Sequence, residues 1–176
     1  MSSIGHLPPF ANVSFRVGYR MDSEDPMNSA VDWRLVETAY GSAQNIPALL
    51  ACLAGADHAA AMAASHDLWC ALCHQHAYVS SAALPALPGL LSVLDQADDE
   101  LAVEILDILT GFAVCTSVTA KNEAWMNTLR MQLQEQRSRF LVLAESKNEL
   151  IAGFASGIAD NLRFPPMPPK DSAPIT

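Results

Sequence analysis

The residues best suited to chemistry are concentrated in one short stretch, Cys70-Ala-Leu-Cys73-His74, with His76 close behind. The spacing Cys-x-x-Cys-His is that of a c-type haem attachment site. Haem is attached in this way outside the cytoplasm, and the first residues of the chain show no basic start followed by an apolar core. The stretch also fits the apolar stripe of a packed helix. We therefore interpret it as the end of a helix and predict no haem.

Zinc is the second chemistry that these residue types allow. The candidate ligands close together in the sequence are His66, Cys70, Cys73, His74 and His76. A structural zinc site normally needs two ligand pairs from separated parts of the chain, and here a second pair exists only if Cys115 or His58 folds back. We predict no metal site, and interpret the cysteines as buried thiols and the histidines as surface imidazoles.

Catalysis is disfavoured on similar grounds. Cys73 with His76 could form a nucleophile pair, but nothing basic or glycine-rich lies nearby to lower the thiol pKa or to form an oxyanion site. Glu100 and Glu104 could exchange protons with a substrate only in a cleft, and paired acids on a helix flank are usually solvated. The chain has no phosphate-binding glycine loop. We predict no catalytic residue and no cofactor.

One pattern occurs twice in the chain and predicts its architecture. Ile46-Pro-Ala-Leu-Leu-Ala-Cys-Leu53 returns 41 positions later as Leu87-Pro-Gly-Leu-Leu-Ser-Val-Leu94. Asp57 and Asp98, again 41 positions apart, follow the two copies, and each begins a second helix-length segment. A repeated helix pair is typical of solenoids, because a single pair cannot bury its apolar face alone. We predict an all-α, right-handed α-solenoid of about seven helices with no β-sheet core.

The charge is unevenly distributed over the 176 residues. Between Leu35 and Ala120 there is no Lys or Arg, whereas the rest of the chain has ten acids and ten bases, so the net charge of −9 belongs to the repeats. The nine acids of the repeats are Glu37, Asp57, Asp67, Asp95, Asp98, Asp99, Glu100, Glu104 and Asp107. An acidic surface repels nucleic acid and anionic lipid and attracts basic partners.

Composition divides the chain into three regions. Residues 1–31 are predicted to be an extended arm, in which Val13, Phe15, Val17 and Tyr19 alternate with polar residues. Residues 32–164 form the helical repeat domain, and residues 165–176 a flexible, Pro-rich tail. No apolar run is long enough to span a membrane, so we expect a cytoplasmic protein.

Local signals predict the helices within the repeat domain. A first helix is expected over Trp33–Tyr40, ended by Gly41, and the next helix is capped by Asn45. A turn or short helix over 81–87 is expected to be interrupted at Pro88, where the second Pro-led helix begins. A helix over 121–146 is expected to be irregular and polar around 132–139. Ser146 and Glu149 form a capping box for the last helix.

The segment Trp33-Arg-Leu-Val-Glu-Thr-Ala-Tyr-Gly-Ser-Ala-Gln-Asn-Ile-Pro-Ala-Leu-Leu50 resembles a family of bacterial HEAT-like repeat proteins. The resemblance continues at His74-Gln75, Tyr78, Ser81-Ala82, Pro85 and Leu87-Pro88, and covers roughly residues 31–114. His76 stands where the family usually has Gly. Members of this family are often immunity proteins encoded beside polymorphic or contact-delivered toxins. The resemblance implies a HEAT-like fold and a toxin domain as partner, and it implies no catalytic residue.

The leading functional hypothesis is therefore a non-enzymatic protein that covers a basic active site on a cognate toxin and is a monomer when unbound. The helix from Asp98 to Val114 is apolar on most sides and has one polar stripe, Glu100, Glu104 and Asp107, which we predict to contact the partner. The full set of predicted partner-binding residues is Asp95, Asp98, Asp99, Glu100, Glu104, Asp107, His74, His76 and Tyr78. The alternatives are a general adaptor, or a helical-repeat lyase or DNA glycosylase. The glycosylase is disfavoured because the repeats contain no cation for phosphate.

Overall fold

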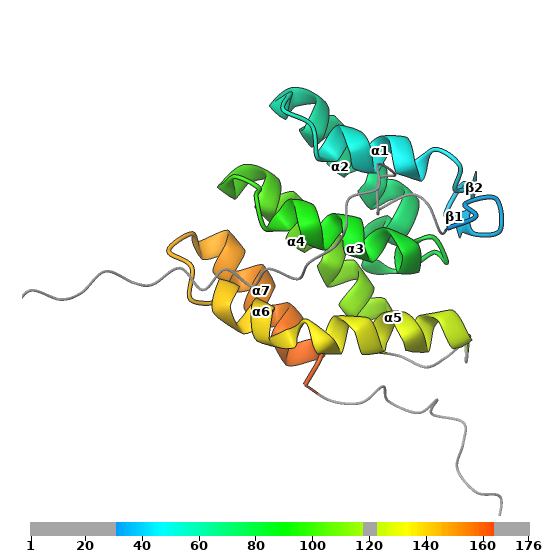
Figure 1. Cartoon of the computed structure of the whole chain (residues 1–176). Helices are drawn as coiled ribbons and strands as arrows, with labels where there is room; N and C mark the ends of the chain where they lie inside the picture. Colours follow the sequence, from blue (N-terminus) through cyan, green and yellow to red (C-terminus); the bar gives the residue numbers. More distant parts are fainter. Residues whose placement is uncertain (1–30, 118–122, 164–176) are drawn as a thin grey trace, which may run out of the picture.

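The computed structural model describes residues 31–117 and 123–163, so nearly all of the predicted arm and the whole predicted tail lie outside the described residues. The described part contains seven α-helices, shown in Figure 1. They are α1 Ile46–Leu53, α2 His58–Cys73, α3 Ala83–Leu94, α4 Asp99–Cys115, α5 Ala124–Glu135, α6 Arg137–Leu143 and α7 Glu149–Asn161. The strands β1 Glu37–Thr38 and β2 Gly41–Ser42 form a minimal antiparallel hairpin. The predicted all-α class is confirmed.

The sequence repeat corresponds to two helix pairs, α1–α2 and α3–α4. Asp57 caps α2, its carboxylate accepting a hydrogen bond from the N–H of Ala60 (3.2 Å). Asp98 caps α4 in the same way and accepts from the N–H of Leu101 (3.0 Å). Each Asp satisfies a backbone donor that the first turn of a helix leaves without an intrahelical partner. The two acidic positions therefore mark the same structural point in each repeat.

The helices lie in two rows. In one row α4 packs between α2 and α7, and in the other α3 packs beside α1 and α5. The turns that join α1 to α2, α3 to α4 and α6 to α7 all lie on the same side of the molecule, at the left of Figure 1. This arrangement agrees with helix pairs stacked in series, and the right-handed superhelical twist stays a prediction.

Helix α4 supplies much of the core. The side chains on its buried sides have 0% exposure: Ile105, Leu106, Ile108, Leu109, Phe112 and Ala113. At about 25 cal/mol per Å² of apolar surface, each large side chain of this kind contributes roughly 1.5–3 kcal/mol to folding. Positions in α4 that remain open to solvent are therefore confined to a narrow side of the helix.

The helix predicted over Trp33–Tyr40 is wrong. These residues form turns and the β1–β2 hairpin, and other elements satisfy their backbone groups. The N–H of Ala39 donates to the carbonyl of Ala71 in α2 (2.9 Å), and the carbonyl of Glu37 accepts from the N–H of Ala82 (3.1 Å). Trp33 is buried, as an apolar helix face would require, but the tertiary contacts outweigh the local 3.6-residue pattern.

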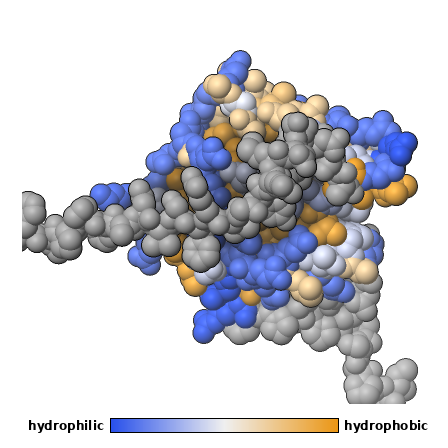
Figure 2. Space-filling model, in the orientation of Figure 1, coloured by the Kyte–Doolittle hydropathy of each residue, from blue (hydrophilic) through white to orange (hydrophobic). Residues whose placement is uncertain are grey.

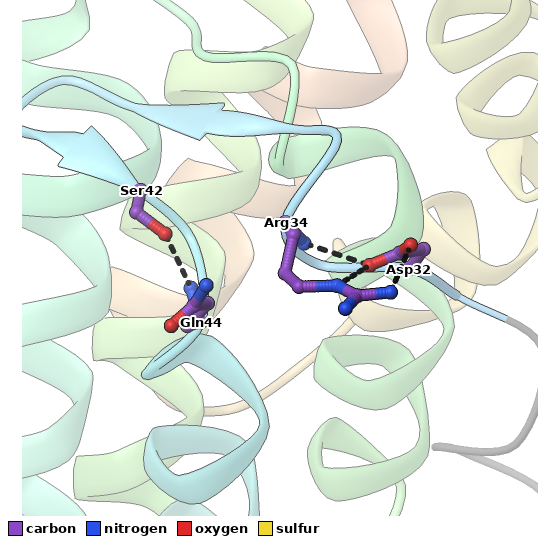
Figure 3. Close-up of polar contacts among 4 residues, drawn as sticks. All are labelled: Asp32, Arg34, Ser42 and Gln44. Atoms are coloured by element: carbon purple, nitrogen blue, oxygen red, sulfur yellow. Dashed lines mark hydrogen bonds and ion pairs between the residues drawn. The ribbon is translucent and has the colours of Figure 1, made fainter.

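Side chains near this segment also favour turns over a helix. Asp32 accepts hydrogen bonds from the backbone N–H and the guanidinium of Arg34, as Figure 3 shows, and these bonds lower the pKa of the Asp32 carboxyl to about 2. Ser42 Oγ accepts from the N–H of Gln44 (3.4 Å). Gly41 has a φ of +111°, which other residues rarely adopt. Such local bonds compete with helix formation.

The predicted interruption at Pro88 is also wrong, because α3 runs unbroken from Ala83 to Leu94 with Pro88 inside it. A proline removes the hydrogen bond to the carbonyl four residues earlier, here Leu84. Pro88 is exposed and Leu84 half-buried. The freed carbonyl therefore lies near the surface, while the buried residues of α3 on the other side hold the helix together.

The C-terminal helices show the predicted irregularity, with one correction. The polar stretch around 132–139 contains a break at Gln136, which separates α5 from α6. The cap of α7 is Asn148 and not Ser146: Asn148 Oδ1 accepts from the N–H groups of Leu150 (3.0 Å) and Ile151 (3.4 Å). Ser146 Oγ instead accepts from the N–H of Asn148 (3.2 Å). Asn148 caps α7 in place of the predicted Ser146 because its side chain satisfies two backbone donors of the first turn at once.

Candidate protein-binding surface

The acidic stripe lies on the side of α4 that the core leaves open. Glu100 is exposed, whereas Glu104 and Asp107, one and two turns later, are half-buried. Asp98, Asp99 and Glu100 stand at the N-terminus of α4, where the helix dipole stabilises negative charge. The acidic residues therefore extend from the end of the α3–α4 turn along the open side of α4. Figure 2 shows hydrophilic residues along the left edge of the molecule, over the turns between helices.

His58 joins the N-termini of the two repeat helices. Its Nδ1 lies 3.1 Å from Asp98 Oδ2 and its Nε2 lies 3.2 Å from Glu100 Oε2. His58 is the first residue of α2, so these contacts link α2 to α4 at the edge of the stack. A neutral imidazole has a single N–H, so it donates to one of the two carboxylates and leaves the charge of both on the surface.

A shallow groove separates the two repeat turns beside His58. It has a volume of about 280 Å³, and its lining includes His58 and Asp98 at the rim and Ala61 and Leu101. The rim carries a carboxylate and an imidazole, and the lining contains no Lys or Arg. A cationic side chain of a partner would meet favourable charge here.

Two further predicted acids have partners that the sequence did not indicate. Asp95 forms an ion pair with Arg139 of α6, which also donates to the carbonyl of Leu91. Asp99 accepts a hydrogen bond from Asn148 Nδ2 at the start of α7 (3.1 Å). No Lys or Arg lies between Leu35 and Ala120, but Arg139, a cation far along the chain, folds back and pairs with Asp95.

The other predicted residues, His74, His76 and Tyr78, lie at the opposite end of α2. His74 to His76 form a short 3-10 turn, η1, in which Gln75 (φ 53°) and His76 (φ 54°) have left-handed backbones. His76 Nε2 lies 3.1 Å from Asp107 Oδ1, close enough for an ion pair, although the two atoms are not aligned as a hydrogen bond. Asp107 thus connects the acidic stripe to this second region.

Aromatic rings pack together around Trp69 in this region. His66 stacks on Trp69 with ring centroids 6.3 Å apart, and His74 and His76 contact the same indole at 5.9 and 6.3 Å. Tyr40 from the hairpin reaches His74, its hydroxyl 3.1 Å from Nδ1. The histidines that resembled metal ligands in the sequence are therefore packed against an indole ring.

The thiols of this region are poorly suited to nucleophilic chemistry. Burial raises the pKa of the Cys73 thiol far above its ordinary value, and the negative charge of Asp107 adds to the effect. Burial also raises the pKa of Cys115, whose thiol donates to the carbonyl of His76 (3.3 Å). Cys70 Sγ lies 3.8 Å from His66 Nε2. Among the described residues, no three His, Cys, Asp or Glu side chains converge as metal ligands.

Arg130 is the buried charge that sequence reasoning missed. It lies in α5 with 2% exposure and donates to the carbonyl of Ala113 near the end of α4 (2.9 Å) and to Asn161 Oδ1 at the end of α7 (2.8 Å). The guanidinium thus binds the C-terminal ends of two helices, where the helix dipole favours a cation. The only sign in the sequence that Arg130 is buried was its position in a helix, three residues before the apolar Leu133.

The structure thus separates the predicted residues into an acidic edge and a histidine-rich end, linked along α4. Comparisons of the chain with models of protein families, with curated proteins and with solved structures gave no match. Among the described helices, none has both the length and the apolar character needed to cross a membrane.

Proposed function

We propose that this protein is a non-enzymatic immunity protein that binds a toxin domain and covers its basic active site. The observation that carries the proposal is the acidic stripe Glu100, Glu104 and Asp107 on the open side of an otherwise buried helix. Among the described residues, the ion-pair contacts of this stripe are to two histidines, His58 and His76. The stripe therefore remains a source of negative potential, which accelerates encounter with a basic partner and is weakened by salt.

The resemblance to HEAT-like immunity proteins supports the toxin as partner. His76 occupies the position where that family usually has Gly, and its φ of 54° lies in the left-handed region that favours glycine. The buried Cys73 and the half-buried Cys115 have raised thiol pKa values, which favour a binding protein over an enzyme with a cysteine nucleophile. Our proposal places the protein in the cytoplasm as a monomer that meets the toxin there.

Reversing the stripe tests the proposal. The triple variant Glu100→Lys, Glu104→Lys, Asp107→Lys should stay helical but associate with the product of the adjacent toxin gene at least about tenfold more slowly at low salt. A matched control makes the same charge change elsewhere, at Glu135, Glu145 and Asp160, which are exposed and lie outside the repeats. The control should associate at a rate much closer to that of the wild type, because none of its three substitutions lies on α4.

The readouts are the association rate at two salt concentrations and the protection of cells that express the toxin. Circular dichroism and the melting temperature check that the triple variant is folded. A wild type that neither binds the toxin nor protects cells would overturn the proposal. A folded triple variant that protects cells as well as the wild type would show instead that the stripe is not the interface. The interface would then be sought at Tyr78, which is 43% exposed. Tyr78 lines a groove of about 480 Å³ together with Trp125 and Met126.

A further inference from the structure

Helix α7 has apolar residues on two sides. One side, with Ile151, Ala155 and Ile158, is buried in the core. A second apolar set recurs at helical spacing, one position earlier: Leu150, Gly153, Phe154 and Gly157. Leu150 is 61% exposed. A surface helix normally has one apolar stripe, so the second one needs its own explanation.

The second apolar side forms a groove between α7 and α4. Its volume is about 370 Å³, and Thr110 of α4 lines it together with Glu149 and the four apolar residues of α7. Its lining is mostly apolar and open to solvent. The groove lies on the row of helices that carries the acidic stripe, since Thr110 follows Asp107 by one turn of α4.

The two glycines in the groove have no packing role in the described part of the molecule. A Cβ atom built at Gly153 or at Gly157 would have nothing within 4 Å. Glycine is the poorest helix former after proline, so two of them one turn apart weaken α7 without an internal benefit. Bare backbone at these positions lets another element approach α7 closely.

Charge decides which occupant fits. A second copy of the chain would bring together two molecules with a net charge of −9 each, and Glu149 lies in the groove itself. An occupant with cations on its flanks is attracted both by Glu149 and by the nearby stripe on α4. We propose that the α4–α7 groove binds an amphipathic helix of the partner, with apolar side chains against Gly153 and Gly157 and Lys or Arg beside Glu149. The proposal rests on the proposed function, because it assumes a basic protein as partner, and it adds the helix-in-groove mode of binding.

A synthetic helix tests the groove. The probe is a fluorescently labelled peptide of Lys and Leu, about 18 residues or five turns long, with Leu at helical spacing. Its dissociation constant is measured by fluorescence anisotropy for the wild type, Gly153→Leu and Gly157→Leu. Each leucine fills the groove, and binding should weaken about tenfold or more, as expected when the centre of an interface is blocked. The melting temperature should not fall, because the added side chain meets open space and leucine is a better helix former.

A matched control puts the same side chain on α7 outside the groove. Ser156 is exposed and does not line the groove, so Ser156→Leu should bind the peptide like the wild type. A second peptide with Glu in place of Lys should not bind. The proposal is overturned if the wild type does not bind the Lys peptide, if both glycine variants bind it normally, or if the Glu peptide binds equally well. A concentration-dependent dimer that Gly157→Leu abolishes would also overturn it, in favour of a second copy.

The same variants separate this inference from the proposed function. In cells that express the adjacent toxin, Gly157→Leu should lose protection together with the triple Lys variant. If the glycine variants protect and only the triple Lys variant fails, the groove is not the docking site and the proposed function stands. If the wild type itself gives no protection, the proposed function fails.

Discussion

Gly111 offers the sharpest test of the packing between the two repeat pairs. It lies in α4 where α2 and the η1 turn approach. A Cβ atom at this position would lie 2.8 Å from Cys73 Cβ, 2.9 Å from Cys73 Sγ and 2.9 Å from His76 Cδ2. Carbon atoms pack best at about 3.5–4.0 Å, so Gly111→Ala creates three close contacts. Cys73 Cβ is fixed to the backbone of α2, and no change of rotamer can move it away.

Two opposing effects set the size of the change. Alanine stabilises a helix interior by about 1 kcal/mol relative to glycine. Overpacking a close-packed core costs typically about 1–3 kcal/mol, and the upper part of that range applies here because the contacted atoms are held by a second helix. We therefore expect Gly111→Ala to lower the free energy of unfolding by about 1–2 kcal/mol. At about 2–4 °C per kcal/mol, the melting temperature should fall by roughly 2–8 °C.

Urea denaturation followed by far-UV circular dichroism measures this change. Gly153→Ala is the control, because it makes the same substitution in α7 where nothing lies within 4 Å of the new Cβ. It should raise the free energy of unfolding by about 0.5–1 kcal/mol. If Gly111→Ala were as stable as the wild type, or stabilised like Gly153→Ala, the close approach of α2 and α4 at Gly111 would be refuted.

Two further changes test the buried polar groups. Arg130→Met should lower the free energy of unfolding by about 3 kcal/mol, because it leaves the Ala113 carbonyl and the Asn161 side chain without their donor. Urea denaturation measures this loss, and a value below about 1 kcal/mol would contradict the role of Arg130. Burial raises the pKa of Cys73 in the folded state, so folding favours the neutral thiol. The stability that this thiol contributes is fully present below the ordinary thiol pKa of about 9 and is lost as the pH rises further. The stability of the wild type relative to Cys73→Ala should therefore decline above pH 9, and a difference that stays constant to higher pH would contradict the prediction.

Local interactions determined the features that the sequence predicted well. The repeated Pro-led segment and the two aspartates 41 positions apart correspond to helix pairs with the same cap, because an N-cap needs only its own first turn. The apolar periodicity after Asp98 predicted a helix buried on most sides, and the structure places Glu100, Glu104 and Asp107 on its open side.

Tertiary contacts decided the rest. Trp33–Tyr40 has a helical pattern but folds as a hairpin, because its backbone hydrogen bonds are made with α2 and with the start of α3. Pro88 can lie inside α3 only because its side of the helix faces solvent. The partners of the acids, His58 and Arg139, lie far from them in the sequence. Such pairings depend on how helices are placed in space, and no local pattern of residues encodes them.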